Sequence, residues 1–290
     1  MIHPSAQDGY TIPPHGIELL KRDGYLITSI PAFSVAELQE SFNRFIQADP
    51  LYKERYLQQY FGYGFDGYSY QGQTDSSNQA ADDLVSTFVF SNFYEVIRYP
   101  VEFQNFLTES WQQIRPLIQS LEISLLEELK LSGLLDFYQQ HMGHMVSCNY
   151  YPPIENFATA AADNTRLSAH PDVSLFTVFP FGMDGELEAE LKDRAGCTIW
   201  QSIPASRQVV LFPGYLMELW SDGAIKALNH RVKLAQDVTA ERFSFAFFSL
   251  PFPERRFVLP NRGPASASGS ISDSRFTTSE GYFEAYLNLF

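Results

Sequence analysis

The sequence has little cysteine and little basic charge. Cys148 and Cys197 are the only cysteines in 290 residues, which excludes a disulfide framework and indicates a reducing, cytoplasmic location. Lys and Arg number 20 against 34 Asp and Glu, a formal net charge of −14. A surface of that sign repels phosphate groups, so we expect neither nucleic-acid nor membrane-surface binding.

Long hydrophobic runs are also missing. No apolar stretch approaches the roughly 20 residues that a bilayer-spanning helix needs, and the first residues lack the basic start and apolar run of a signal peptide. Hydrophobic residues nevertheless make up 45% of the chain and aromatic residues 15%, enough for a sizeable, β-rich core. We therefore expect a soluble globular protein without an obligate protein partner.

The hydrophobic periodicity predicts a single domain over residues 1–290. Residues 1–140 are expected to form a helical support, 141–255 a β core, and 256–290 a flexible loop with a C-terminal helix. Apolar residues recur at three- and four-residue steps over 101–131, where Pro116 is expected to break or kink the helix. After Gly143 the period changes to two, which predicts strands around 145–152, 166–180, 195–202, 207–213, 228–234 and 242–250. Strands at this spacing are typical of an antiparallel barrel or sandwich.

Residues 61–83 are rich in Gly, Tyr and polar residues and have no regular period. Loops of this length are uncommon in compact domains and often functional. The segment is therefore either a rim that covers a pocket, with 61–70 as its aromatic part, or a mobile excursion.

One pattern of side chains indicates metal chemistry. His170 and Asp172 are two residues apart at the end of a predicted strand, so they face the same side, and His230 lies on a later strand. Two histidines and one carboxylate on one face of a metal ion leave three coordination positions open, as in the facial triad of non-haem Fe(II) oxygenases. The H-x-D pair alone is a weak signal, because a strand histidine is more often a structural residue.

Two further pairs share strand faces. Arg242 and Ser244 are suited to holding a carboxylate, since a guanidinium group and a hydroxyl can both donate to it. The alternative for Arg242 is a pairing with an internal Asp or Glu. Asn149 and Tyr151 offer an amide and a phenol to a small polar ligand, or simply end a strand before the Pro-Pro turn.

These segments in this order resemble the isopenicillin N synthase-like group of Fe(II)/2-oxoglutarate oxygenases. The resemblance is carried by NYYPP, HPD with the hydrophobic strand after it, WSDGAIKALNHRV and RFSFAFFSLP, and covers roughly residues 145–255. It implies a mainly β fold with supporting helices, a double-stranded β-helix of the jelly-roll, cupin-like kind. The stretch between His230 and Arg242 is slightly longer than the family pattern, which implies a longer turn.

The resemblance also implies the roles of the residues. His170, Asp172 and His230 would ligate Fe(II), while Arg242, Ser244, Tyr151 and Asn149 would bind 2-oxoglutarate. Together with O₂, such an enzyme oxidises a substrate C–H bond and releases succinate and CO₂. The carboxylate at Asp172 argues against a halogenase, since related halogenases have Gly or Ala there.

The substrate is less well defined by the sequence. Phe248, Ser168 and Phe176 are candidates for lining its pocket, with ordinary barrel filling as the alternative. Arg166, Arg255 and Arg256 are more consistent with solvated surface than with an acidic-substrate site, His141 and His144 with structural roles, and Cys148 with a buried apolar role. We favour a small organic molecule, such as an amino acid or secondary metabolite.

Three other functions remain open. One is an Fe(II)/O₂ oxidase of the same fold that does not use 2-oxoglutarate. The second is a non-catalytic small-molecule-binding barrel, and the third is an oxygenase that modifies protein or nucleic acid.

Overall fold

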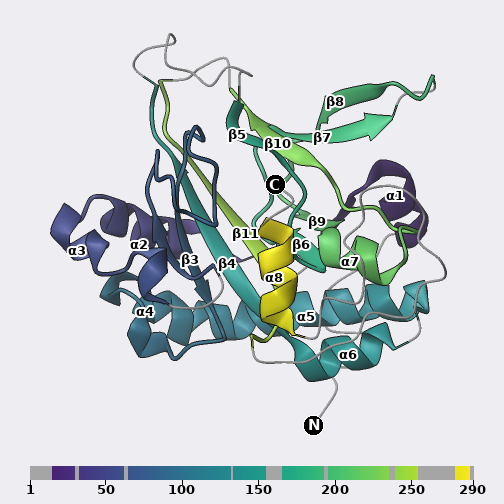
Figure 1. Cartoon of the computed structure of the whole chain (residues 1–290), viewed down its shortest axis with the longest axis horizontal. Helices are drawn as coiled ribbons and strands as arrows, with labels where there is room; N and C mark the ends of the chain where they lie inside the picture. The colour runs from purple at the N-terminus through teal and green to yellow at the C-terminus, as the bar shows by residue number, and fades with distance from the viewer. Residues whose placement is uncertain are drawn as a thin grey trace.

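Two long antiparallel strands, β4 (Met142–Tyr151) and β11 (Arg242–Pro251), form the centre of the structure and pair along their whole lengths (Figure 1). The computed structural model describes residues 15–29, 33–61, 65–131, 133–154, 165–192, 195–234, 239–253 and 278–287. Alternate residues of both strands line one cavity: Met145, Ser147, Asn149 and Tyr151 on β4, and Arg242, Ser244, Ala246 and Phe248 on β11. The period of two in the sequence therefore does place these side chains on a common face.

The strands form two sheets, and all of their pairings within these sheets are antiparallel. The larger sheet has the order β1-β9-β6-β11-β4-β3-β2 and the smaller one β5-β10-β7-β8. The remaining strands are β1 (Leu26–Thr28), β2 (Gly67–Ser69), β3 (Ser86–Ser91), β5 (Thr165–His170), β6 (Phe176–Phe179), β7 (Leu187–Lys192), β8 (Thr198–Ser202), β9 (Val209–Pro213) and β10 (His230–Lys233). Residues 1–140, expected to be a helical support, thus also supply three strands.

Helices cover the larger sheet on the face away from the cavity, where α4, α5 and α6 lie beneath it in Figure 1. The helices are α1 (Gly16–Asp23), α2 (Ala36–Ile46), α3 (Pro50–Glu54), α4 (Val101–Thr108), α5 (Ser110–Leu129), α6 (Leu134–His141), α7 (Tyr215–Trp220) and α8 (Ser279–Leu287), with short 3-10 turns η1 (Gln58–Tyr60) and η2 (Val96–Arg98). None of the helices in the described ranges is long and apolar enough to cross a bilayer.

Of the two expectations for Pro116, a break or a kink in the helix, the break is wrong and the kink stays a prediction. Helix α5 runs through Pro116, and the chain instead turns at Glu109, which separates α4 from α5. Glu109 has φ −115° and ψ −76°, outside helical geometry. Pro116 removes one hydrogen-bond donor, but Ile114 and Ile118 on either side are fully buried, and that packing holds the helix together.

The space between the sheets is only partly filled by apolar side chains. Phe179, Leu187, Val210, Phe212 and Val232 form a buried cluster there. Beside them remains a cavity of about 420 Å³, lined by residues of both sheets, by the loop over residues 76–80 and by helix α8.

Candidate active site

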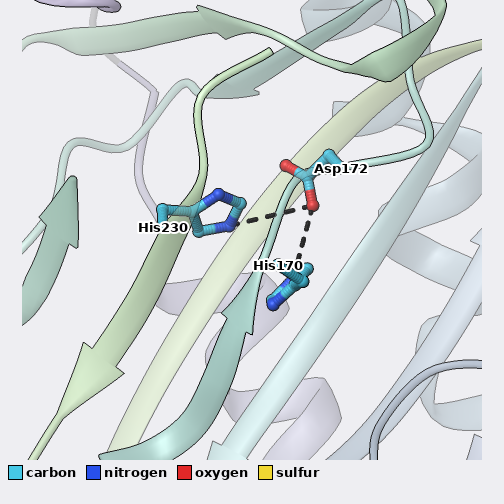
Figure 2. A group of neighbouring side chains, drawn as sticks. All are labelled: His170, Asp172 and His230. Atoms are coloured by element: carbon cyan, nitrogen blue, oxygen red, sulfur yellow. Dashed lines mark ion pairs between the residues drawn. The ribbon is translucent and has the colours of Figure 1, made fainter. Parts of the chain in front are cut away.

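His170, Asp172 and His230 converge at the cavity (Figure 2). His170 ends β5, His230 begins β10, and the two residues are direct partners in the pairing of these strands. Asp172 lies two residues beyond β5. Its Oδ1 is 3.6 Å from Nε2 of His170 and 3.8 Å from Nε2 of His230. Within the described parts of the chain, these residues are the one set of three or more His, Cys, Asp or Glu side chains arranged to hold a metal ion.

Backbone carbonyls fix the orientation of both imidazole rings. Nδ1 of His170 is 2.7 Å from the carbonyl oxygen of Ser168, and Nδ1 of His230 is 3.0 Å from that of Leu228. A carbonyl can only accept, so each Nδ1 carries the proton and each Nε2 presents a lone pair. Burial also lowers the pKa of His230, which favours the neutral ring that binds metals.

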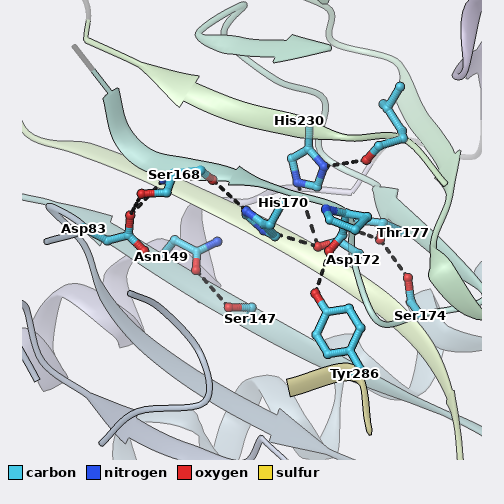
Figure 3. A network of polar contacts seen from close by, with 12 residues as sticks. Asp83, Ser147, Asn149, Ser168, His170, Asp172, Ser174, Thr177, His230 and Tyr286 are labelled. Atoms are coloured by element: carbon cyan, nitrogen blue, oxygen red, sulfur yellow. Dashed lines mark hydrogen bonds and ion pairs between the residues drawn. The ribbon is translucent and has the colours of Figure 1, made fainter. Parts of the chain in front are cut away.

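Asp172 is fixed by hydrogen bonds at its side chain and at its backbone. The hydroxyl of Thr177 donates to Oδ2 at 2.5 Å, and the amide of Tyr215 donates to the Asp172 carbonyl at 2.6 Å. The hydroxyl oxygens of Thr177 and Ser174 are 2.9 Å apart, which extends the network shown in Figure 3. Because Oδ2 is occupied, Oδ1 is the oxygen that faces the histidines.

This donor set fits a divalent transition metal. Two Nε2 lone pairs and a carboxylate oxygen lie within 4.8 Å of one another, and three such acceptors repel each other unless a cation lies between them. His230 and Asp172 are buried, which increases that repulsion. Two imidazoles with one carboxylate suit Fe(II) and leave coordination positions for other ligands.

Arg242, Ser244, Asn149 and Tyr151 lie together along the same cavity. Arg242 is opposite Tyr151, and Ser244 is opposite Asn149, in the pairing of β11 with β4. Nδ2 of Asn149 donates to the hydroxyl of Ser244 at 3.3 Å. Burial raises the pKa of the Tyr151 phenol, against the opposing effect of the Arg242 charge. The two sequence pairs therefore form one polar site.

Arg242 also has acidic partners that the sequence leaves open. Its Nε is 2.5 Å from Oδ2 of Asp184 and 3.1 Å from Oε2 of Glu186, and its Nη2 donates to Oδ1 of Asp184 at 3.1 Å. Its Nη1 is buried and has no hydrogen-bond partner among the described residues. The acidic residues hold one side of the guanidinium, and the remaining nitrogen fits a carboxylate such as the distal group of 2-oxoglutarate.

The candidate substrate residues divide into two groups. Phe248 and Ser168 line the cavity. Phe176 is fully buried in the larger apolar core and is not among the cavity-lining residues, which favours the barrel-filling alternative for it. The hydroxyl of Ser168 donates to Asp83 at 2.7 Å.

The 61–83 segment also contributes to the cavity. Phe65 and residues 76–80 form part of its wall, and residues 62–64 lie outside the described residues.

Arg166 corrects one expectation, because it is buried rather than solvated. Its guanidinium donates to the carbonyl oxygens of Pro152 and Ala240. Arg255 and Arg256 lie outside the described residues.

His144 is buried 2.9 Å from Glu122, whose carboxylate also accepts a hydrogen bond from Tyr138. These contacts suit the structural role expected for His144. Cys148 is buried as expected, and Cys197 is exposed.

Several residues of the site carry no signal in the sequence. Thr177, Asp184, Asp83 and Tyr286 reach it from a strand, two loops and the C-terminal helix, and none belongs to a recognisable motif with the residue that it contacts. Thr177 is a partial exception, because the alternating pattern after Asp172 predicts the strand on which it lies.

Comparisons with known proteins agree with this geometry. Residues 142–251 match the family model of the 2OG-Fe(II) oxygenase superfamily. A 2-oxoglutarate-dependent dioxygenase, gloF, of Glarea lozoyensis is 25% identical over 248 residues, which are 82% of this chain and 62% of that protein. The chain therefore spans about three fifths of the length of this relative. The proline hydroxylase buaE of Petromyces alliaceus is 25% identical over 107 residues, 36% of this chain and 33% of that protein.

Solved structures show the same fold. A full-length protein of Neurospora crassa, crystallised in complex with alpha-KG, superposes with a TM-score of 0.65 at 18% identity, over 95% of this chain and 89% of that one. The expected jelly-roll fold with helices is confirmed. The narrower isopenicillin N synthase-like grouping stays a prediction. Residues 142–251 are therefore similar to the 2OG-Fe(II) oxygenase superfamily, and His170, Asp172 and His230 lie inside this match.

Proposed function

We propose that this protein is an Fe(II)- and 2-oxoglutarate-dependent dioxygenase that oxidises a C–H bond of a small organic molecule. For a hydroxylation, R–H, 2-oxoglutarate and O₂ would give R–OH, succinate and CO₂. The observation that carries the proposal is that one cavity is lined by two complementary groups. These are the acceptors of His170, Asp172 and His230, and Arg242, whose Nη1 has no hydrogen-bond partner among the described residues.

In this proposal the triad holds the metal ion. The carbonyls of Ser168 and Leu228 keep both Nε2 lone pairs directed at it, and Thr177 keeps one oxygen of Asp172 turned toward the histidines. The bound Fe(II) would supply the activation of O₂ that is coupled to decarboxylation of 2-oxoglutarate.

The cosubstrate site would be formed by β4 and β11. Arg242 would receive the distal carboxylate of 2-oxoglutarate through Nη1, with Ser244 and Tyr151 as neighbouring hydroxyl donors. Asn149 would lie beside the other end of the cosubstrate. Leu167, Phe179, Leu187 and Val232 line the same cavity, and their apolar surfaces would exclude water from the reaction.

The substrate would occupy the part of the cavity beside Phe248, Ser168 and the 76–80 loop. The wall that residues 76–80 contribute consists of Ser76, Ser77, Asn78, Gln79 and Ala80. Its hydroxyl and amide groups favour a small molecule with hydrogen-bonding groups, such as an amino acid or secondary metabolite. Two cysteines, Cys148 and Cys197, are too few for a disulfide framework, which favours a reducing, cytoplasmic location.

Anaerobic titration tests this function. Purified protein is titrated with Fe(II) and then with 2-oxoglutarate, and the visible charge-transfer band of the ternary complex is recorded. A band that needs both additions, and is lost in Asp172→Ala, supports the dioxygenase. Iron binding without a band would favour the Fe(II)/O₂ oxidase instead, and absence of iron binding would favour a non-catalytic binding barrel.

A further inference from the structure

The C-terminal helix α8 lies directly against the loop that carries Asp172. In Figure 1 this helix crosses in front of β6 and β11, and in Figure 3 Tyr286 approaches Asp172 from it. Tyr282 and Tyr286 are four residues apart and therefore lie on the same face of the helix. Both tyrosines are buried, and Tyr286 also lines the cavity.

The two phenols bind the carbonyls on either side of the metal ligand. Tyr282 donates to the carbonyl oxygen of Val173 at 2.5 Å, and Tyr286 donates to that of Pro171 at 2.6 Å. The Asp172 carbonyl accepts from the amide of Tyr215. Three consecutive carbonyls are thus each held by one donor, and two of these donors come from α8.

These contacts matter because Asp172 lies outside the regular strand. β5 ends at His170 and β6 begins at Phe176, so the ladder hydrogen bonds that fix His170 do not extend to Asp172. A carboxylate ligand must be held within a fraction of an ångström of its binding position, and the groups that support it therefore contribute to metal affinity.

We propose that α8 is a positioning element of the metal centre, in which Tyr282 and Tyr286 set the backbone path of residues 171–173 and thereby aim Asp172 at the two histidines. The inference rests on the proposed metal-binding role of the triad. According to this inference, a helix more than 100 residues after Asp172 in the chain contributes to metal affinity.

The alternative is that these hydrogen bonds only attach α8 to the rest of the protein. The helix offers a matched control that tests this alternative. The hydroxyl of Ser279, at the first turn of α8, donates to the carbonyl oxygen of Phe252 at 2.8 Å. Ser279→Ala removes one hydroxyl-to-carbonyl bond of the same helix and makes no change at residues 171–173.

The experiment is an anaerobic titration of the full-length protein with Co(II), whose visible absorption reports both affinity and coordination geometry. We expect Tyr286→Phe and Tyr282→Phe each to weaken Co(II) binding about tenfold and to alter the visible bands, by analogy with other groups that support metal ligands. Ser279→Ala should keep the wild-type affinity and spectrum. Thermal unfolding without metal compares the stability losses of these variants.

Each outcome has a defined meaning. If the tyrosine variants bind Co(II) like the wild type, or if Ser279→Ala weakens binding equally, the positioning role is overturned while the proposed function stands. If Asp172→Ala binds as tightly as the wild type, the triad is not the metal site and the proposed function fails as well.

Discussion

Arg242 lies directly opposite Tyr151 in the pairing of β11 with β4, and its guanidinium carbon is 4.7 Å from the centre of the tyrosine ring. The ring covers one side of the guanidinium, and Asp184 binds its Nε and Nη2. The guanidinium is therefore fixed in orientation, and its Nη1 has no hydrogen-bond partner among the described residues. A planar fork held in this way can receive a carboxylate without the entropy cost of ordering a free side chain.

Arg242→Lys is expected to weaken 2-oxoglutarate binding on the order of tenfold to a hundredfold, the loss typical of a charge-assisted hydrogen bond. Lysine keeps the positive charge near Asp184 and Glu186, so this variant avoids the unpaired acidic side chains that Arg242→Ala would leave. Calorimetric titration of Mn(II)-loaded protein with 2-oxoglutarate measures the effect, and Mn(II) affinity itself should not change. Unchanged 2-oxoglutarate affinity would mean that Arg242 serves only its internal acidic partners.

Thr177→Val is expected to weaken metal binding about tenfold, because the donor to Oδ2 of Asp172 is lost while the shape of the side chain is kept. Thr87→Val is the matched control. Thr87 is also a buried strand threonine, but its hydroxyl has no hydrogen-bond partner among the described residues. The control should keep the wild-type metal affinity and gain stability of about 1 kcal/mol. Equal metal affinities in both variants would show that Thr177 does not support the ligand.

Local patterns account for the parts of the site that the sequence does predict. The period of two places Asn149, Tyr151, Arg242 and Ser244 on cavity-facing positions, and the two strands bring them together in register. The spacing of His170 and Asp172 gives their common direction, although the structure ends β5 at His170. These predictions succeed because each depends on residues only one or two positions apart.

The missed features depend on contacts between distant segments. Strand β7, with the sequence LEAELK, has a composition that favours a helix, and it forms a strand because β10 and β8 pair with it on both sides. The burial of Arg166 depends on carbonyls at Pro152 and Ala240. The docking of α8 on residues 171–173 likewise has no local pattern, so the sequence predicts the helix but not its role.

Gly214→Ala should destabilise the metal-binding loop. A Cβ at this position would lie 2.2 Å from the carbonyl oxygen of Ser174 and 2.9 Å from that of Asp172, so the backbone of residues 172–174 or that of residue 214 must move. The conformation itself is open to alanine, since φ is −97°. We expect a loss of about 1–3 kcal/mol in the free energy of unfolding, together with weaker Co(II) binding.

Gly72→Ala is the control for that change. Gly72 has a φ of +82° and no neighbouring atoms within 4 Å of an added Cβ. The free energy of unfolding of Gly72→Ala should fall by about 1 kcal/mol through backbone strain. This variant should bind Co(II) like the wild type. Wild-type Co(II) affinity in Gly214→Ala would show that the loop accommodates the methyl group without moving Asp172.

The last prediction concerns Asp66, which is fully buried and accepts a hydrogen bond from Tyr99 at 2.6 Å, while its Oδ2 has no hydrogen-bond partner among the described residues. Burial raises the pKa of Asp66 to about 7, an effect that the hydrogen bonds from Tyr99 and Ser91 only partly offset. In the unfolded chain this carboxyl titrates near its ordinary value of about 3.9. Between these two values the folded state binds one more proton than the unfolded state.

Stability should therefore fall as pH rises through this window. The contribution of Asp66 to the free energy of unfolding decreases by about 1.4 kcal/mol per pH unit between roughly pH 5 and 6.5, and levels off above its folded pKa. Asp66→Asn removes this titration, so its stability should decline less steeply by that amount, whatever its absolute value. Urea unfolding of both proteins at several pH values measures the two slopes. Parallel slopes would show that Asp66 is already ionised in the folded protein, with Tyr99 and Ser91 compensating for its burial.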